Sequence, residues 1–209
     1  MAQKNSPIAN RLGIIEDWRS RWFSIKNYKS YLHDDLRIRE YLDKRLRGFS
    51  VDKIEIERSP GQLMLRLWTA RPGLIIGRGG TGIEELKSEL ESIIEDKTRV
   101  RLEVQEIKKP TMSAAIVAEQ IAEQIERRVP FRRTMKQAFA KIIANPEVKG
   151  AKIQISGRLD GSEIAREEHT ESGLLPLQTL REKIDYAQNT AFTTYGTVGI
   201  KVWIYKPGD

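Results

Sequence analysis

A run of glycines interrupted by one arginine is the first feature of the sequence whose chemistry suits a ligand. Gly77, Arg78, Gly79 and Gly80 form a Gly-x-x-Gly step that opens directly onto an amphipathic segment. Glycine has no side chain, so the backbone of such a loop can approach a sugar-phosphate chain closely, and a following helix start presents free N–H groups to phosphate. Arg78 adds a mobile cation. The pattern predicts an RNA-binding loop that clamps a short run of nucleotides.

The same stretch permits two other interpretations. Gly77, Gly79 and Gly82 also satisfy Gly-x-Gly-x-x-Gly, the dinucleotide-binding fingerprint, and Glu103 lies about where a ribose-binding acid would fall. That fold needs a parallel sheet with further β-α units, whereas a hairpin precedes these glycines. A plain connecting turn is the third interpretation. No Gly-Lys-Ser/Thr step follows a phosphate-loop spacer, so an NTP-driven motor is not expected.

A second feature is a segment with basic residues and no acid between Arg127 and Lys141. The basic residues are Arg127, Arg128, Arg132, Arg133, Lys136 and Lys141. On a helix, Arg132 and Lys136 are one turn apart with Arg133 beside them, while the apolar residues cluster toward the other side. Such a ridge is expected to meet phosphates regardless of base sequence. A solvated helix face and a membrane surface are the alternatives, and the latter would need exposed aromatic wedges.

Eight other arginines are weaker candidates for RNA contact. They are Arg11, Arg19, Arg21, Arg71, Arg127, Arg128, Arg158 and Arg166. The first three lie among Trp18 and Trp22, where an arm could stack on RNA or pack on its own domain. The aromatic residues near the end of the chain are interpreted as sheet packing, with a base-stacking platform as the alternative; they are Tyr186, Tyr195, Trp203 and Tyr205.

Composition narrows the class of protein. The chain has 209 residues, 36 Lys and Arg against 29 Asp and Glu, and a net charge of +7, which favours a polyanionic partner. There is no cysteine, and His33 and His169 are far apart, so neither a metal site nor a cofactor is expected. No segment reaches the roughly 20 apolar residues of a membrane span, and residues 1–10 lack a signal-peptide pattern, so a cytoplasmic protein is expected.

The residue pattern in the first half of the sequence predicts an arm over residues 1–33 and a domain over residues 34–107. A helix is expected over Asp35–Arg47, capped by Asp34 and ended by Gly48. Alternating apolar residues predict further elements. These are two strands around 51–56 and 63–67 joined at Ser59-Pro60-Gly61, a helix after Gly82, and a strand around 100–104.

The second half predicts a domain over residues 112–209, after a linker at Lys108-Lys109-Pro110. Ser113 should cap a helix reaching Arg127, and Pro130 should separate it from a helix over Phe131–Ala144. The second helix is expected to turn Met135, Phe139, Ile142 and Ile143 inward. Strands follow at about 151–157, 163–171, 181–194 and 197–205. The expected fold class is α+β, with two helices against a mostly antiparallel sheet in this half.

Several separated motifs together resemble the bacterial-type ribosomal protein S-three family. They include Arg11-Leu12-Gly13-Ile14, Thr69-Ala70-Arg71-Pro72-Gly73, Glu126-Arg127-Arg128-Val129-Pro130-Phe131-Arg132-Arg133, Ser156-Gly157-Arg158-Leu159, Glu163-Ile164-Ala165-Arg166, Thr193-Thr194-Tyr195-Gly196 and Gly199-Ile200-Lys201-Val202-Trp203-Ile204. The resemblance implies a non-enzymatic chain with a type II KH domain followed by a C-terminal α+β domain. Many members continue into a longer polar tail, whose contacts are not carried over to a sequence that stops at Asp209.

The resemblance also implies where the chain works. It implies a place in the head of the small ribosomal subunit, against its ribosomal RNA, with Arg132, Arg133 and Lys136 facing messenger RNA at the entrance tunnel. Expected neighbours are proteins of the S-ten and S-fourteen types in the head and of the S-four and S-five types at the entrance. The alternative function is a free KH-type regulator of RNA outside the ribosome.

Overall fold

The computed structural model describes residues 5–94 and 99–206 of the chain. The chain divides into two compact units, one formed by Trp18–Lys108 and the other by the residues up to Asp17 together with those from Lys109 onward. The segment expected as one arm is therefore shared between the units. No helix among the described residues is long and apolar enough to cross a membrane.

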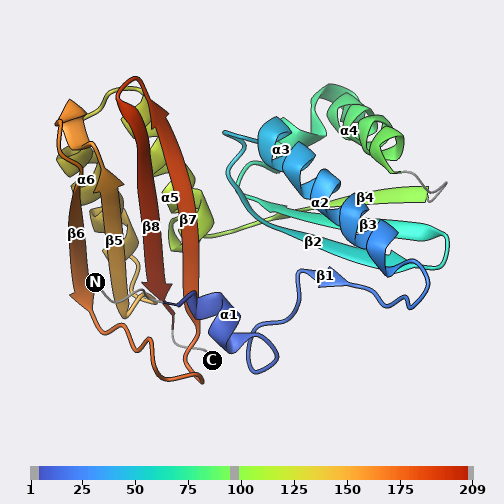
Figure 1. Cartoon of the computed structure of the whole chain (residues 1–209), viewed down its shortest axis with the longest axis horizontal. Helices are drawn as coiled ribbons and strands as arrows, with labels where there is room; N and C mark the ends of the chain where they lie inside the picture. Colours follow the sequence, from blue (N-terminus) through green and yellow to red (C-terminus); the bar gives the residue numbers. More distant parts are fainter. Residues whose placement is uncertain (1–4, 95–98, 207–209) are drawn as a thin grey trace. The chain divides into compact units, whose positions relative to one another are not determined.

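The first unit is a four-stranded sheet with helices packed on it (Figure 1). Its elements are β1 (Ser20–Arg21), α2 (Tyr28–Arg45), β2 (Val51–Ser59), β3 (Gln62–Thr69), α3 (Pro72–Ile76), the 3₁₀ turn η1 (Arg78–Gly80), α4 (Thr81–Ile93) and β4 (Arg99–Glu106). The strand order is β1-β2-β3-β4, with an antiparallel β2–β3 hairpin and parallel β1–β2 and β3–β4 pairs. Parallel pairing of β3 with β4 requires a crossover, which α3 and α4 supply.

Local sequence explains most of this unit. Leu63, Leu65 and Leu67 alternate with half-exposed residues along β3 and are fully buried, as a strand with one covered face requires. The hairpin turns at Gly61, whose φ of 76° is a left-handed conformation that glycine adopts without strain. The helix after Gly82 buries Leu86 and Leu90. The predicted hairpin and this helix are confirmed, whereas α3 was not foreseen.

The prediction for the first long helix was wrong at its start. Helix α2 begins at Tyr28, so Asp34 and Asp35 lie inside it and are buried. Arg58 on β2 neutralises both: its Nη2 lies 2.7 Å from Asp35 Oδ1 and its Nη1 3.4 Å from Asp34 Oδ2. Asp35 also accepts the indole N–H of Trp22 at 2.8 Å. An aspartate pair that resembles a helix cap in the sequence is instead part of a buried ion cluster.

The second unit is an antiparallel sheet with two helices on one face (Figure 1). Its elements are α1 (Pro7–Arg11), η2 (Pro110–Met112), α5 (Ala114–Glu126), α6 (Phe131–Ile143), β5 (Gly150–Gly157), η3 (Leu159–Gly161), β6 (Arg166–Gly173), β7 (Ile184–Thr193) and β8 (Gly196–Tyr205). The strand order is β6-β5-β8-β7. This confirms the expected two-helix, antiparallel-sheet domain and the α+β class.

Both helices begin where the sequence indicates. The side chain of Ser113 accepts the N–H of Ile116, and Pro130 is the N-cap of α6. Met135 and Ile142 are buried and Phe139 packs partly against the core, but Ile143 is 42% exposed, contrary to the prediction. It lies one residue beyond Ile142, about 100° around the helix, which turns its side chain away from the sheet.

Candidate nucleic-acid interface

Helix α6 separates an apolar side from a basic side. Phe131, Thr134, Met135 and Ile142 are buried, whereas Arg132, Arg133, Lys136 and Lys141 are exposed. Pro130 is the N-cap of α6, so the adjacent Arg132 and Arg133 lie in the first turn of the helix. The structure therefore brings Arg132, Arg133 and Lys136 together on one exposed surface, called here the α6 basic face.

The three cations of the α6 basic face differ in how they are paired. Arg132 donates to both carboxylate oxygens of Glu168 on β6, with Nη2–Oε1 at 2.9 Å and Nε–Oε2 at 3.2 Å. These hydrogen bonds lower the pKa of Glu168 and raise that of Arg132. Arg133 and Lys136 have no hydrogen-bond or ion-pair partner among the described residues. Two of the three charges are therefore available to an anion without displacing a protein carboxylate.

The turn between α5 and α6 holds two further candidate cations. Arg127 forms an ion pair with Glu123, one helical turn earlier, and stays exposed. Arg128 adopts φ 63°, a left-handed conformation that is uncommon for a residue with a side chain. The unusual backbone directs the exposed Arg128 side chain to the rim of a cavity, together with Val129.

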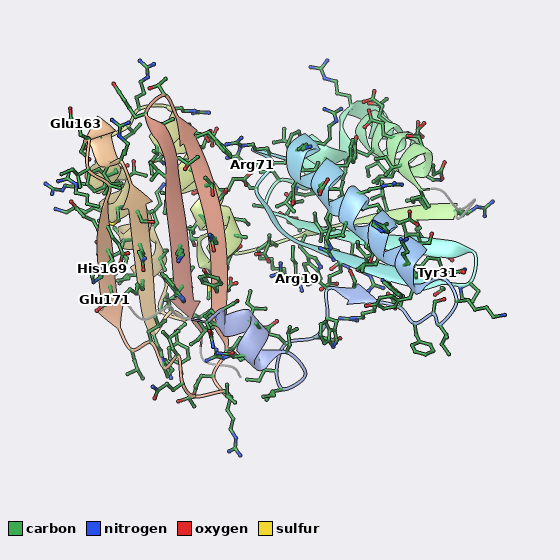
Figure 2. All side chains as sticks on the ribbon, in the orientation of Figure 1. Arg19, Tyr31, Arg71, Glu163, His169 and Glu171 are labelled. Carbon is green, nitrogen blue, oxygen red and sulfur yellow. The ribbon has the colours of Figure 1, made fainter. Side chains whose placement is uncertain are left out.

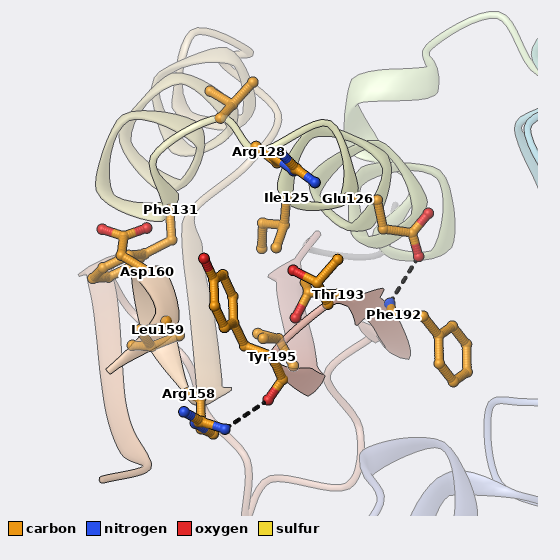
Figure 3. Close-up of a pocket in the computed structure, with 14 residues that line it drawn as sticks. Ile125, Glu126, Arg128, Phe131, Arg158, Leu159, Asp160, Phe192, Thr193 and Tyr195 are labelled. Atoms are coloured by element: carbon orange, nitrogen blue, oxygen red, sulfur yellow. Dashed lines mark hydrogen bonds between the residues drawn. The ribbon is translucent and has the colours of Figure 1, made fainter. Parts of the chain in front are cut away.

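That cavity has a volume of about 360 Å³ and lies wholly within the second unit (Figure 3). Three segments form it: the end of α5 with the start of α6, the turn around Asp160, and the connection from β7 to β8 at Thr194. Its lining includes Arg128 and Arg158 and the aromatic ring of Tyr195. Tyr195 is 57% exposed, so the interpretation of this residue as sheet packing was wrong.

The remaining candidates of this unit lie on or near the β5–β6 connection. Arg158 is exposed, but its guanidinium is held in place by two backbone carbonyls, Ser162 O at 2.9 Å and Tyr195 O at 3.2 Å. Arg166 is the first residue of β6, and its Nε lies 4.0 Å from Oε1 of Glu168, whose carboxylate also pairs with Arg132. Both arginines are thus surface cations of the same unit as the α6 basic face.

Arg11 was a candidate RNA contact, and the structure contradicts this. Its side chain is completely buried. Its guanidinium donates to five backbone carbonyls, one on α1 and four in the segment before β7. The acceptors are Pro7, Pro176, Leu177, Thr179 and Glu182. Arg11 therefore fastens α1 to the loop that covers Trp203 and Tyr205, and no RNA can reach it.

In the first unit the glycine loop lies between two helices. Gly77 ends α3, and Gly80 is the N-cap of α4, with φ values of 72° and 88°. A Cβ at Gly79 or Gly80 would meet nothing within 4 Å, whereas one at Gly82 would lie 2.6 Å from Ile75 O. Packing thus requires a glycine at Gly82, whereas Gly79 and Gly80 leave open space beside the backbone.

Arg78 completes this loop. Its side chain is exposed and has no hydrogen-bond or ion-pair partner among the described residues. The dinucleotide interpretation fails here, because the fingerprint must join a strand to a helix and α3 separates β3 from these glycines. Glu103, its supposed ribose ligand, instead pairs with Arg66 on β3 at 3.3 Å.

The other candidates of the first unit are dispersed. Arg19 and Arg71 are exposed and labelled in Figure 2. The carbonyl of Arg19 accepts the N–H of Ile56 at 2.8 Å, which holds the incoming chain beside β2. Arg21 is exposed on β1 and donates to Trp18 O at 3.4 Å. The structure does not gather these three residues into one site.

Comparison with known proteins supplies the family. Residues 37–112 match the KH domain family, and residues 121–204 match the family described as ribosomal protein S3, C-terminal domain. The chain is 48% identical over 206 residues to the small ribosomal subunit protein uS3 of Listeria monocytogenes, covering 99% of this chain and 93% of the relative. The chain belongs to the uS3 family.

Two further uS3 proteins show the same extent of similarity. That of Exiguobacterium sibiricum is 48% identical over 205 residues, and that of Lysinibacillus sphaericus 47% over 206 residues. They cover 98% and 99% of this chain, and 93% and 94% of the relatives. The glycine loop falls in the matched KH domain, whose order α2-β2-β3-α3-α4-β4 is that of the type II fold, and the α6 basic face falls in the uS3 C-terminal domain.

Proposed function

We propose that this chain is a non-enzymatic constituent of the small ribosomal subunit in the cytoplasm, where it binds ribosomal RNA and guides messenger RNA. Its relatives of near-equal length are small-subunit uS3 proteins. The observation that carries the RNA-binding part is the α6 basic face, where Arg133 and Lys136 are exposed and lack protein partners among the described residues. Cations held on a packed helix attract a polyanion without regard to its sequence.

The ribosomal RNA contacts are proposed to come from both units. In the KH domain, Gly79 and Gly80 leave space for a sugar-phosphate chain, and Arg78 supplies a charge beside it. In the C-terminal domain, Arg128, Arg158 and Arg166 are exposed and cationic. Exposed arginines of this kind fix the position of RNA through its phosphates. Arg19, Arg21, Arg71 and Arg127 remain weaker candidates.

The messenger RNA contact is proposed for Arg132, Arg133 and Lys136. A phosphate chain that crosses the α6 basic face meets Arg133 and Lys136 directly, and it competes with Glu168 for Arg132. The sequence has no phosphate-binding Gly-Lys-Ser/Thr loop. Any opening of message structure at this face therefore occurs by passive capture of strands that translocation has already separated.

The proposed protein neighbours are the S-ten and S-fourteen types in the head and the S-four and S-five types at the messenger entrance. Chemical crosslinking of assembled small subunits, with the crosslinks of each domain mapped separately, measures which neighbours contact this chain.

Replacement of both unpaired cations tests the RNA-binding surface. The double variant Arg133→Gln with Lys136→Gln should bind single-stranded RNA with a salt dependence reduced by about 1.4 in the slope of log K against log salt, roughly 0.7 for each lost phosphate contact on a single strand. The matched control is Lys44→Gln with Lys149→Gln, two exposed lysines elsewhere in the chain. An unchanged slope in the first variant would refute the assignment.

A translation assay tests the messenger part. Small subunits containing the charge reversals Arg133→Glu and Lys136→Glu should assemble normally and translocate slowly through a stable message hairpin, while handling an unstructured message as usual. Normal speed through the hairpin would leave the α6 basic face as a ribosomal RNA contact only.

A further inference from the structure

The cavity beside the α6 basic face has the lining of a ligand site. Its volume of about 360 Å³ lies within the roughly 300–1,000 Å³ usual for small-molecule sites. Ile125, Phe131 and Leu159 form an apolar floor, and polar groups stand at the rim. A planar, mostly apolar group with polar edges fits such a lining better than a compact hydrated ion does.

The aromatic wall of the cavity is Tyr195. A Cβ added to Gly161 would come within 3.2–3.3 Å of the Tyr195 ring, so the glycine lets the ring lie close over this turn. Figure 3 shows the ring extending into the space between Phe131 and Thr193. Its hydroxyl has no hydrogen-bond partner among the described residues. An exposed ring with a free hydroxyl stabilises no core, and it offers both a stacking surface and a hydrogen-bonding group.

Charge at the rim indicates the chemistry of the occupant. Arg128 and Arg158 lie on opposite sides of the cavity in Figure 3, and the two carbonyls that hold Arg158 fix its position. Asp160, at φ 52°, lines the cavity, and after Glu168 it also helps to raise the pKa of Arg132. Two cations flanking an aromatic wall suit phosphates on either side of a base, and a carboxylate accepts hydrogen bonds from base amino groups.

We propose that this cavity receives one unpaired nucleobase of the RNA strand that lies on the α6 basic face, with the base against Tyr195 and its flanking phosphates at Arg128 and Arg158. The proposal rests on the RNA-binding function proposed above and adds a base contact to it. Continuity supports RNA over a protein segment as the occupant, because Phe131 of the cavity floor directly precedes Arg132 in α6. A strand on this face thus passes the mouth of the cavity.

The test separates base contact from phosphate contact. The full chain is titrated with a single-stranded RNA and with the same strand made abasic at its centre, and the two affinities give a base preference. Stacking on an aromatic side chain strengthens binding about tenfold or more per base. Tyr195→Ala should therefore reduce the base preference about tenfold and leave the affinity for the abasic strand unchanged, whereas Tyr195→Phe should retain the preference within about twofold.

A second measurement needs no variant. A 4-thiouridine-containing strand irradiated on the wild-type chain should form adducts within residues 192–195 or 158–161, identified by mass spectrometry. Absence of these adducts, as expected if a protein segment fills the cavity, would overturn the proposal even where Tyr195→Ala unfolds the domain.

The two proposals fail in different ways. The nucleobase site alone is overturned if Tyr195→Ala leaves the base preference unaltered while the Arg133→Gln and Lys136→Gln double variant still binds RNA more weakly than the wild type. A wild-type chain that binds neither strand overturns both the site and the RNA-binding function.

Discussion

Replacement of Arg11 gives the sharpest separation between a structural arginine and an RNA-binding one. The buried guanidinium donates at 2.7 Å to Glu182 O and at 3.0 Å to Thr179 O, with three longer contacts to other carbonyls. Arg11→Met keeps the apolar stem but leaves these acceptors without a donor. Breaking a buried, charge-assisted network of this kind costs roughly 3–5 kcal/mol in the free energy of unfolding.

Arg11→Lys should cost less, about 1–3 kcal/mol, because an ammonium group keeps the charge but cannot span acceptors on both α1 and the segment before β7. The matched control is Arg181→Met, since Arg181 is exposed and lies in the same segment. Its replacement should change the free energy of unfolding by less than about 0.5 kcal/mol.

Hydrogen–deuterium exchange of the full chain measures the effect in the correct unit. The slowest amides of β7 and β8 should exchange between about a hundredfold and a few thousandfold faster in Arg11→Met, whereas those of β2 and β3 serve as the internal control. RNA affinity at a temperature where the variant is folded should equal that of the wild type. Weaker RNA binding with unchanged exchange would refute the structural role and restore Arg11 as an RNA contact.

Three further replacements test other parts of the structure. Glu168→Gln should raise RNA affinity about threefold by releasing Arg132. Because pairing lowers the pKa of Glu168, the ion pair is complete above the ordinary glutamate pKa of 4.5 and breaks as the pH falls through the lowered pKa. Below that lowered pKa, the RNA affinities of variant and wild type should converge. Arg58→Met should lower the free energy of unfolding of the KH domain by roughly 3–5 kcal/mol in chemical denaturation, since Asp34 and Asp35 would keep buried charges. Gly82→Ala should cost about 1–3 kcal/mol in the same assay through the clash with Ile75 O, whereas Gly73→Ala, with open space around it, should cost much less.

Elements specified by neighbouring residues could be predicted from the sequence. Pro130 and the apolar spacing after it define α6, and Ser59-Pro60-Gly61 between two alternating runs defines the β2–β3 hairpin. Both depend on contacts only a few residues apart, which periodicity and turn chemistry encode. The helix start at Tyr28 was missed because a capping aspartate and an aspartate paired with Arg58, 23 or 24 residues away, look alike in a sequence.

The cavity was missed for a related reason. Its wall and floor come from residues around 125–131, 158–161 and 192–198, three segments that are adjacent only after the sheet has formed. The Ser156-Gly157-Arg158-Leu159 motif was visible in the sequence, but the position of the following Gly161 beside Tyr195 depends on the pairing of β5 with β8. Without that pairing, an aromatic residue between strands is most simply interpreted as core.

The α6 basic face shows how counting charges along one helix overestimates a binding surface. The sequence places three cations within five residues, and their spacing on α6 is as expected. Glu168, which lies 36 residues later than Arg132, comes beside it only through the pairing of β6 with β5. A phosphate at Arg132 replaces one anion by another and releases few additional counterions, so two residues, not three, should dominate the salt dependence of this face. A third full contribution to that slope should emerge only when Glu168 is neutralised.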